Sequence, residues 1–426
     1  MLRDAGHVAY FAGGCVRDEL LGLTPSDYDV ATDAPPVRIS GLFKRTSEVG
    51  ASFGVVLVKS HGVAVEVATF RSEGPYSDRR RPDTVHFSDA PTDARRRDFT
   101  INALFLDPLD AGSAPQSPRG GRVIDYVGGT EDLGRRVLRA VGDAEQRLAE
   151  DHLRALRAVR LTARLELALD SATGAAIARH ARELAGVSRE RIGEELRKML
   201  AHPARARAAV LLHELGLDAP VLDEPSRAWL PGGSLARLEG RGVPVTTALA
   251  AWALDRGVTP DATGGGEVAR RWRRALCLSN EETEELKRSI AGVGVLEREW
   301  PGLGVARRKR AAGSAWFGES LRLVRIRNAA RGEAIGTEVE ALAGTDSGLA
   351  PPPLVTGDDL IALGLPPGPG FKVVLDLVYD AQLEGGVRTP AEARTLALRL
   401  ASDRGQGPGG SSADAGGGEP GPRSGV

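Results

Sequence analysis

The chain has few of the residues that mark secreted or membrane proteins. Its 426 residues include only two cysteines, Cys15 and Cys277, which lie far apart in the sequence. This argues against a disulfide framework and a cysteine-based zinc site, and it fits a reducing cytoplasm. No apolar run approaches the roughly 18 residues that a membrane-spanning helix needs. Two charged residues, Arg3 and Asp4, precede any apolar core of the kind that a signal peptide carries. We therefore expect a cytoplasmic protein that makes no membrane contact.

The sequence also lacks an excess of either charge and any internal repeat. Lysine and arginine total 56, aspartate and glutamate total 57, and the formal net charge is −1. This balance neither favours nor excludes nucleic acid as a partner, so only local clusters of charge can decide. There is no repeat of roughly 20–50 residues, and the absence of a His-Asp dipeptide argues against a metal-dependent phosphohydrolase domain. The length exceeds what one hydrophobic core usually serves, so we expect about two to four domains.

The most informative stretch is Gly13-Gly14-Cys15-Val16-Arg17-Asp18, which is followed by Ser26-Asp27-Tyr28-Asp29-Val30. A Gly-Gly turn lets backbone N–H groups approach a phosphate because no Cβ is in the way, and Arg17 adds a positive charge nearby. We expect Asp27 and Asp29 to lie on one strand, with both carboxylates on the same face. Two such carboxylates can hold divalent cations about 3.5–4 Å apart, the arrangement of two-metal phosphoryl and nucleotidyl transfer. A pair of aspartates alone is more often solvated than catalytic, but with the upstream turn it indicates a phosphate-binding site.

Residues 1–137 have the pattern of a mixed α/β domain. Two runs rich in β-branched residues, 55–59 and 63–68, predict a β-hairpin. Glu66 lies within the second run, where a carboxylate is costly unless a cation or hydrogen bonds satisfy it. It is a candidate third carboxylate for the aspartate pair, although its alternation with apolar neighbours also fits an outward-facing strand residue.

A polar and basic loop is expected at residues 72–98, where arginines gather at positions 79–81 and 95–97. This loop has few apolar anchors, so we expect it to be mobile unless a ligand or nucleic acid orders it. Residues 108–121 are rich in glycine and proline and predict a surface insertion, to which we assign no chemistry.

From about residue 131 the pattern becomes helical, and its most informative part is residues 150–164. Four arginines fall within a third of the helix circumference at about 100° per residue; they are Arg154, Arg157, Arg160 and Arg164. We expect Glu150 and Asp151 to begin this helix, where acidic side chains suit the helix dipole. A solvated face with ion pairs would give the same spacing. Asp151 lies one turn before Arg154, however, so an acceptor and a donor could together read the edge of a base.

The rest of the chain predicts further helices. Residues 188–196 predict a capped, charged helix, and helical patterns with glycine and proline breaks continue beyond it. Two arginine-rich segments, 270–274 with its Trp272 and 307–310, fit contact with an RNA backbone as well as exposed helix faces. The Gly/Pro/Ser-rich residues 403–426 predict disorder.

Taken in order, these features resemble the motifs of class II tRNA nucleotidyltransferases and poly(A) polymerases, within the DNA polymerase beta-like nucleotidyltransferase superfamily. The resemblance covers roughly residues 5–200. It is carried by Gly13-Gly14-x-Val16-Arg17-Asp18, Asp27-x-Asp29, Glu66-Val67-Ala68-Thr69-Phe70-Arg71, Arg96-Arg97-Asp98-x-x-x-Asn102-Ala103, Glu150-Asp151-x-x-Arg154 and Ser188-Arg189-Glu190-Arg191. Several ordered motifs at these spacings are far more specific than any one of them.

The resemblance implies an α+β fold. An N-terminal α/β nucleotidyltransferase head with a mixed β-sheet would be followed by an all-α neck, body and tail. The corresponding ranges are residues 1–137 for the catalytic head, 138–203 for the base-recognising neck, 204–345 for the RNA-binding body, 346–402 for the tail and 403–426 for the disordered end.

The resemblance also implies roles for particular residues. Asp27, Asp29 and Glu66 would be catalytic and would hold two Mg²⁺ ions. Asp151 and Arg154 would select the incoming base without a nucleic-acid template. The full set of residues implied to bind the nucleotide, CTP or ATP, is Gly13, Gly14, Arg17, Arg97, Asp98, Asn102, Asp151, Arg154, Arg157 and Arg160.

The implied activity is template-independent addition of C, C and A to the 3′ end of tRNA, with release of pyrophosphate. The same motifs fit enzymes that add only CC or only A, and poly(A) polymerases, and a catalytically silent RNA-binding protein is a further alternative. Two departures from the family pattern bear on the product: His152 stands where the family usually has proline, and the loop between Phe87 and Asp98 is about one residue short. That loop serves the switch from C to A addition in the family. No protein partner is expected, and the oligomeric state stays open.

Overall fold

The computed structural model describes residues 1–47, 54–60, 62–74, 84–110, 117–118, 120–227 and 231–403. Three features expected from the sequence lie wholly or partly outside the described residues: the arginines at 79–81, the insertion at 108–121 and the C-terminal end beyond residue 403. The chain divides into two compact units, of which the first comprises Met1–Val258 and Thr263–Lys287, and the second Thr259–Ala262 and the chain from Arg288 onward. In the described ranges, no helix is both long enough and apolar enough to cross a membrane.

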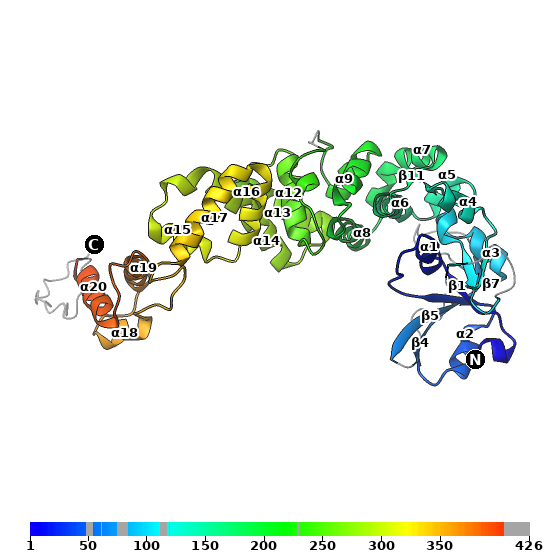
Figure 1. Ribbon diagram of the computed structural model, residues 1–426, viewed down its shortest axis with the longest axis horizontal. Helices are drawn as coiled ribbons and strands as arrows, with labels where there is room; N and C mark the ends of the chain where they lie inside the picture. Colours follow the sequence, from blue (N-terminus) through cyan, green and yellow to red (C-terminus); the bar gives the residue numbers. More distant parts are fainter. Residues whose placement is uncertain are drawn as a thin grey trace, which may run out of the picture. The chain divides into compact units, whose positions relative to one another are not determined.

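The first unit begins with a mixed β-sheet, which has seven strands among the described residues (Figure 1). In spatial order they are β3 (Thr46–Ser47), β4 (Val55–Ser60), β5 (Val63–Thr69), β2 (Asp29–Thr32), β1 (Tyr10–Ala12), β8 (Phe105–Asp107) and β9 (Arg122–Ile124). Neighbouring strands are antiparallel except β2 and β5, which run parallel. Two smaller sheets pair β6 (Arg71–Glu73) with β7 (Val85–Phe87), and β10 (Val137–Leu138) with β11 (Ala168–Leu169).

The predicted β-hairpin is confirmed as β4 and β5, which pair in antiparallel register. Successive residues of a strand face opposite sides of the sheet, so Val67 is buried while Glu66 is exposed. Strand β2 lies on the other side of β5, with Asp29 opposite Glu66. The sheet register therefore brings two of the candidate carboxylates side by side.

Short helices accompany the sheet, and longer ones follow it. Four helices of the first unit lie between or just after the strands of the large sheet: α1 (Gly14–Leu20), α2 (Pro36–Leu42), α3 (Ala90–Arg95) and α4 (Gly129–Gly134). The later ones are α5 (Ala144–Glu150), α6 (Leu153–Arg164), α7 (Ser171–Arg179), α8 (Arg189–Ala201), α9 (Arg205–Glu214), α10 (Asp218–Leu222), α11 (Ser234–Arg237), α12 (Val245–Asp255), α13 (Ala262–Leu276) and α14 (Asn280–Gly294), whose end passes into the second unit. In the core of the sheet-bearing part, the rings of Phe70 and Phe105 meet edge to face at 5.8 Å.

One helix boundary differs from the expectation. Glu150 ends α5, and α6 begins only at Leu153. Between them Asp151 has an extended backbone, with φ −151° and ψ 104°, and its Oδ1 accepts a hydrogen bond from the Leu153 N–H at 3.0 Å. The prediction that Glu150 and Asp151 lie in the arginine-bearing helix is therefore wrong, because Glu150 ends α5 and Asp151 lies between the two helices, just before His152, the N-cap residue of α6.

In the described part of the second unit, all regular secondary structure is helical. Its helices are α15 (Val305–Ala312), α16 (Phe317–Arg327), α17 (Ala329–Ala343), α18 (Gly357–Ala362), α19 (Gly370–Leu383) and α20 (Pro390–Ser402). The last three share a core that includes Leu360, Val374 and Ala397. The division of the helical chain into neck, body and tail stays a prediction.

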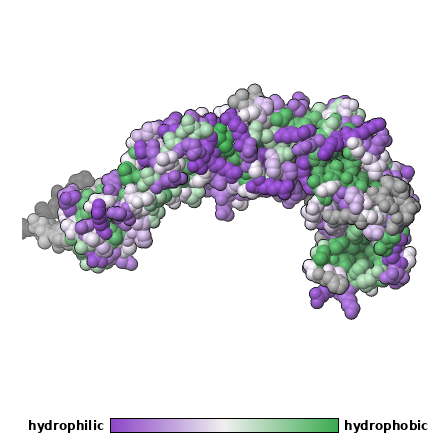
Figure 2. All heavy atoms as spheres, viewed as in Figure 1, coloured by the Kyte–Doolittle hydropathy of each residue, from purple (hydrophilic) through white to green (hydrophobic). Residues whose placement is uncertain are grey.

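Helix α13 shows how the arginine-rich segments sit on the surface. Trp272 is fully buried, with its ring 5.9 Å from that of Trp252, so it cannot contact RNA as the sequence suggested. Arg270, Arg273 and Arg274 on the same helix are exposed. Hydrophilic residues cover much of the helical part on the face that Figure 2 shows. Any contact of α13 with RNA would therefore be electrostatic, without stacking on tryptophan.

Candidate functional site

The Gly-Gly turn joins β1 to α1. Gly13 has φ 75° and ψ −123°, a conformation that only glycine adopts without strain. A Cβ at this position would lie 2.9 Å from Arg97 Nη1. That guanidinium is fixed in place, because it donates to the Asn102 carbonyl at 3.1 Å and to Asp93 Oδ2 at 3.0 Å. The turn is thus a narrow backbone surface with an arginine directly beside it.

A chain of hydrogen bonds runs from this turn toward α6. Arg17 is 5 % exposed and donates from Nε to Asp18 at 2.7 Å and from Nη1 to Asn102 Oδ1 at 2.5 Å. Asn102 in turn donates to Asp98 Oδ1 at 3.1 Å, and Arg157 Nε donates to Asp98 Oδ2 at 2.8 Å. The predicted nucleotide-binding residues of the turn, the basic loop and the arginine-bearing helix therefore form one connected network.

Asp98 is the buried centre of that network. Burial alone would raise the pKa of this carboxyl, but the Arg157 guanidinium and the hydrogen bonds from Asn102 and the Phe99 N–H lower its pKa to about 2. Asp98 is therefore a carboxylate at neutral pH, and its negative charge fixes the position of Arg157.

The three candidate carboxylates lie near one another but on different elements. Asp29 is the first residue of β2 and Glu66 is its partner on β5. The prediction that Asp27 and Asp29 share a strand is wrong, because β2 begins at Asp29 and Asp27 lies in the preceding loop, where Ser26 Oγ donates to its Oδ1 at 3.1 Å. Burial, followed by the charges of Glu66 and Asp27, raises the pKa of Asp29 to about 6, while Arg97 opposes the rise.

These carboxylates fit a hard divalent cation, although they do not enclose one. Their oxygens are the ligands that Mg²⁺ prefers. A cation would also relieve the repulsion from Glu66 and Asp27 that, after burial, raises the pKa of Asp29. Within the described ranges, no three acidic, histidine or cysteine side chains form a complete metal-binding group. This is compatible with Mg²⁺, which usually takes one or two carboxylates from the protein and its other ligands from water and substrate phosphates.

The arginines of α6 occupy one face of that helix, and each has a partner. Arg160 Nε donates to Glu195 at 2.6 Å, and Arg164 Nη2 donates to Asp18 at 3.0 Å. Arg154 Nη1 donates to the Arg147 carbonyl at 2.6 Å and also forms an ion pair with Glu150. The opposite face is apolar and buried, as the helical spacing predicted.

Asp151 and Arg154, the pair predicted to read a base, are each held by other parts of the chain. Asp151 Oδ2 accepts a hydrogen bond from Arg191 Nη2 on α8 at 2.6 Å, while its Oδ1 accepts one from the Leu153 N–H, the first of α6. Each member of the pair is therefore oriented by a different element, Asp151 by α8 and Arg154 by the end of α5.

One cavity of about 710 Å³ brings these features together. It is lined by all but one of the residues predicted as site residues, namely Gly13, Gly14, Arg17, Asp27, Asp29, Arg97, Asp98, Asn102, Asp151, Arg154, Arg157 and Arg160. Glu66 is the exception, and it adjoins the cavity through its strand neighbour Asp29.

The cavity also contains residues to which the sequence gave no site role: Asp18, Ser26, Arg71, Arg96, Leu153, Leu161, Arg164, Arg191 and Lys198. Asp18, Arg71, Arg96 and Arg191 lie within the motifs that carry the family resemblance, so membership of a motif was the signal that could have identified them. Nothing in the local sequence distinguishes Lys198 from any other lysine on an exposed helix face.

Comparison with known protein families and curated proteins agrees with this geometry. Residues 9–139 match the family of the Poly A polymerase head domain, and residues 166–228 match the family described as the probable RNA and SrmB-binding site of polymerase A. The CCA-adding enzyme of Geobacillus stearothermophilus is 35% identical over 406 residues, 92% of each chain. The CCA-adding enzyme of Lactiplantibacillus plantarum is 37% identical over 298 residues, 68% of this chain and 69% of that protein.

Solved structures give the same result. The crystal structure of the Bacillus stearothermophilus CCA-adding enzyme in complex with CTP superposes with a TM-score of 0.75 at 30% identity, covering 95% of this chain and 96% of that one. A tRNA nucleotidyltransferase complexed with a primer tRNA and an incoming ATP analog shares the fold, with a TM-score of 0.62 at 21% identity over 80% of this chain and 97% of that one. The predicted α+β fold with a mixed sheet is confirmed. This chain belongs to the CCA-adding enzyme family.

Proposed function

We propose that this protein adds C, C and A to the 3′ end of tRNA, using CTP and ATP without a nucleic-acid template and working in the cytoplasm. The observation that carries the proposal is the single cavity in which a phosphate-binding turn, clustered carboxylates and a base-reading helix meet. Membership of the CCA-adding enzyme family specifies the product. In the reaction, the RNA 3′ oxygen bonds to the α-phosphorus of the nucleotide, the bond to pyrophosphate breaks, and the hydroxyl proton passes to water.

The N-terminal side of the cavity would bind the triphosphate. The backbone of Gly13 and Gly14 is open to a phosphate because neither residue has a side chain. Arg97 supplies positive charge beside the turn, where its bonds to Asp93 and Asn102 hold it in place. A charge that is fixed before the substrate arrives needs no rearrangement during the reaction, and this favours electrostatic stabilisation of the transition state.

Asp27, Asp29 and Glu66 would hold two Mg²⁺ ions together with the substrate phosphates. The ions, when bound, supply Lewis-acid chemistry that favours loss of the hydroxyl proton and balances the charge of the leaving pyrophosphate. The protein's part is to keep the carboxylates close to one another, which the register of β2 against β5 and the hydrogen bond from Ser26 to Asp27 accomplish.

Asp151 and Arg154 would select the base from the opposite side of the cavity. A carboxylate accepts hydrogen bonds and a guanidinium donates them, so together they can distinguish the edges of cytosine and adenine from those of uracil and guanine. The ion pair of Arg157 with Asp98 links this base-reading helix to the phosphate-binding turn.

The deciding experiment uses three tRNA transcripts, which lack the last three, the last two or the last nucleotide of the mature end. Each is offered CTP and ATP, separately and together, with Mg²⁺. Extension of the shortest transcript by three nucleotides and no further is the expected result. A stop after two nucleotides would identify a CC-adding enzyme, and reaction of the longest transcript alone would identify an A-adding one. A long adenylate ladder would identify a poly(A) polymerase, and no extension of any transcript would favour a catalytically silent RNA-binding protein.

A further inference from the structure

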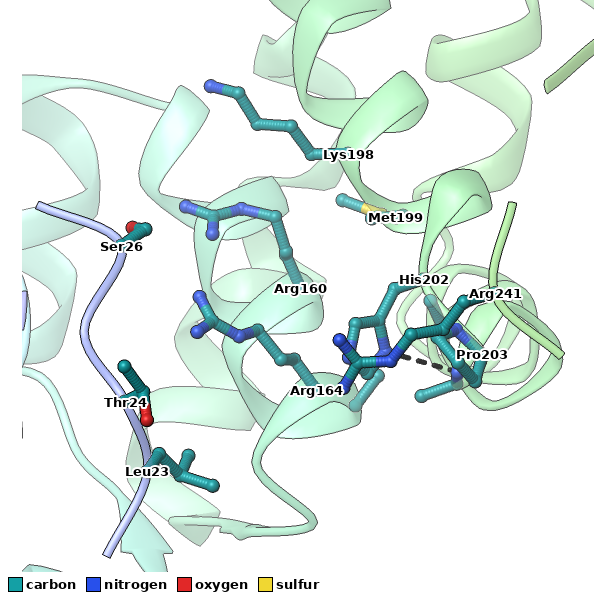
Figure 3. Close-up of a pocket in the computed structure, with 13 residues that line it drawn as sticks. Leu23, Thr24, Ser26, Arg160, Arg164, Lys198, Met199, His202, Pro203 and Arg241 are labelled. Atoms are coloured by element: carbon teal, nitrogen blue, oxygen red, sulfur yellow. Dashed lines mark hydrogen bonds between the residues drawn. The ribbon is translucent and has the colours of Figure 1, made fainter. Parts of the chain in front are cut away.

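A cavity of about 930 Å³ adjoins the nucleotide cavity, and its arginines have carboxylate partners (Figure 3). Figure 3 shows Arg160 and Arg164 extending from α6 toward the loop that carries Ser26. Arg160 donates to Glu195, and Arg164 donates to Asp18. Because Ser26 and both arginines also line the nucleotide cavity, this cavity belongs to the site already described.

Lys309 on α15, in the second unit, is a cation without such a partner. It lies in the arginine-rich segment 307–310, yet it is only 1% exposed. Its Nζ donates to Thr345 Oγ1 at 2.7 Å and to Ser347 Oγ at 2.6 Å. Both acceptors are neutral hydroxyls, and in the described ranges no carboxylate forms an ion pair with Lys309. An ammonium has three N–H donors, so one donor and the whole charge stay uncompensated.

This uncompensated charge favours binding of an anion. Burial of an ionised ammonium is strongly unfavourable unless a counter-charge accompanies it. For the same reason, burial lowers the pKa of Lys309. An anion beside Nζ would supply the missing charge and would accept the third N–H in a charge-assisted hydrogen bond.

Lys309 lines a cavity of about 560 Å³ that lies entirely within the second unit. Its wall comes from α15, the end of α17 with the turn after it, residues 351–354, and the end of α19 with the turn after it. Much of this wall is apolar, and the apolar side chains are Val305, Leu342, Pro351, Leu354, Leu383 and Val387. A concave, largely apolar surface with a few polar groups is typical of sites for small molecules.

Hydrogen bonds within the chain hold one wall of this cavity in place. Gln382 on α19 uses both ends of its amide, because Oε1 accepts from the Leu354 N–H at 3.0 Å and Nε2 donates to the Pro352 carbonyl at 2.8 Å. The hydroxyl of Tyr379 donates to the Pro351 carbonyl at 2.9 Å. Residues 351–354 are therefore fixed before a ligand arrives, which reduces the entropic cost of binding.

The other charged residues of the lining limit the charge that a ligand can carry. Asp346 and Glu384 are negative, Arg388 is positive, and all three are exposed. Together with Lys309 these charges sum to zero. An anion with a single charge would complete the environment of Lys309. A phosphate monoester carries about 1.5–2 negative charges at neutral pH, and an RNA strand carries many more, so the two carboxylates would repel both.

We propose that this cavity binds a small monocarboxylate with an apolar body, whose carboxylate accepts the third N–H of Lys309 and whose apolar part lies against the apolar wall. The inference does not depend on the proposed function, since no residue of this lining belongs to the nucleotide cavity.

The test measures binding of hexanoate to the full chain by isothermal titration calorimetry at neutral pH, without RNA or nucleotide. Two analogues each lack one of the expected interactions: acetate has the carboxylate without the apolar chain, and hexanol has the chain without the charge. We expect hexanoate to bind at least about tenfold more tightly than either analogue.

Substitution of Lys309 assigns the binding to this cavity. Lys309→Met removes the charge and keeps an unbranched apolar chain, so hexanoate should bind at least about tenfold more weakly than to wild type and no more tightly than hexanol. Lys372→Met is the matched control, because Lys372 is exposed on α19 and lies outside the cavity lining. It should leave the affinity for hexanoate unchanged.

Asp346→Asn provides a test at an exposed residue, whose replacement leaves the buried part of the cavity intact. Loss of a charge that repels the ligand should strengthen hexanoate binding about twofold. An affinity equal to that of wild type would place the ligand outside this cavity and contradict the proposal.

Three further results would overturn the proposal. The first is equal affinity of wild type for hexanoate and hexanol, and the second is unchanged hexanoate binding in Lys309→Met. The third is a loss of tRNA affinity in Lys309→Met, but not in Lys372→Met, by a protein that does not bind hexanoate, since the cavity would then hold an RNA phosphate. Hexanoate binding requires no nucleotide addition, so failure of either proposal would leave the other standing.

Discussion

Arg191 on α8 donates a 2.6 Å hydrogen bond to Asp151, the acidic member of the predicted base-reading pair. The other oxygen of that carboxylate accepts the N–H of Leu153 at the start of α6. Both oxygens of Asp151 are thus oriented by the protein before any nucleotide arrives. A base that hydrogen-bonds to Asp151 meets a carboxylate that cannot rotate freely, and this is a physical basis for discrimination between bases.

Replacement of Arg191 should therefore relax the choice of nucleotide. In Arg191→Ala we expect the preference for CTP and ATP over UTP and GTP, measured as a ratio of kcat/KM values, to fall about tenfold. Arg191→Lys should recover part of it, because an ammonium can donate one hydrogen bond to Asp151. Arg182→Ala, at an exposed arginine outside the nucleotide cavity, is the control. An equal fall in kcat/KM for all four nucleotides would indicate that Arg191 only supports the fold.

Replacing either member of the base-reading pair, Asp151 or Arg154, should change nucleotide selection more than replacing Arg191. Asp151→Ala or Arg154→Ala should admit UTP and GTP, because the acceptor or the donor for the base edge is lost. Asp151→Asn should retain the shape of the side chain and change which base is preferred, since an amide both donates and accepts. Nucleotide selection identical to wild type in all three variants would leave Asp151 and Arg154 as members of surface ion pairs only.

The buried pair of Asp98 and Arg157 predicts a pH dependence of stability. The pKa of Asp98 is about 2 in the folded protein, and that of an unfolded aspartate is about 3.9. A lowered folded-state pKa stabilises the protein above the unfolded value, and this contribution disappears as the pH falls through the folded value. Its size at neutral pH is about 2.6 kcal/mol.

Denaturant unfolding of wild type and Asp98→Asn measures this contribution. The wild type should be more stable at pH 7 and at pH 5, and the difference should shrink between about pH 4 and pH 2. A difference that stays constant over this range would show that the charge of Asp98 is not what stabilises the pair.

Gly13 should tolerate no side chain. Gly13→Ala would force alanine into a glycine-only conformation and bring its Cβ to 2.9 Å from Arg97 Nη1. Strain of this kind costs about 1–3 kcal/mol, and relief by moving Arg97 would impair the phosphate-binding turn. We expect a higher KM for both CTP and ATP. Gly6→Ala is the control, because Gly6 also has a positive φ of 85° but no atom within 4 Å of an added Cβ. Similar effects of the two substitutions would mean that backbone strain, and not the position of Arg97, is responsible.

Local sequence predicted the components of the site better than their arrangement. Spacing identified the arginine face of α6 and the hairpin of β4 and β5, because both depend on periodicity within a short segment. The end of α5 at Glu150 was missed. The Asp151 side chain hydrogen-bonds locally to the Leu153 N–H, and such side-chain bonds to the backbone compete with continuation of a helix.

Contacts between distant segments could not be derived from periodicity at all. Arg191 reaches Asp151 across 40 positions of sequence, and Arg164 reaches Asp18 across 146. Trp272 is buried beside Trp252, although its neighbours in the sequence are arginines. The cavity that contains Lys309 is similarly built from four segments, so no single stretch of sequence carries its signature.

The most direct test of the account is the activity of Asp29→Ala on the transcript that lacks all three terminal nucleotides. Asp29 begins β2, opposite Glu66, and burial, followed by the charges of Glu66 and Asp27, raises its pKa to about 6. A divalent cation would neutralise this local negative charge. With CTP, ATP and Mg²⁺, wild-type protein should add three nucleotides. The Asp29→Ala variant should bind the transcript with unchanged affinity and extend it at least about a thousandfold more slowly, since metal-assisted charge stabilisation contributes several kcal/mol. Extension by Asp29→Ala at a rate close to that of wild type would contradict the account.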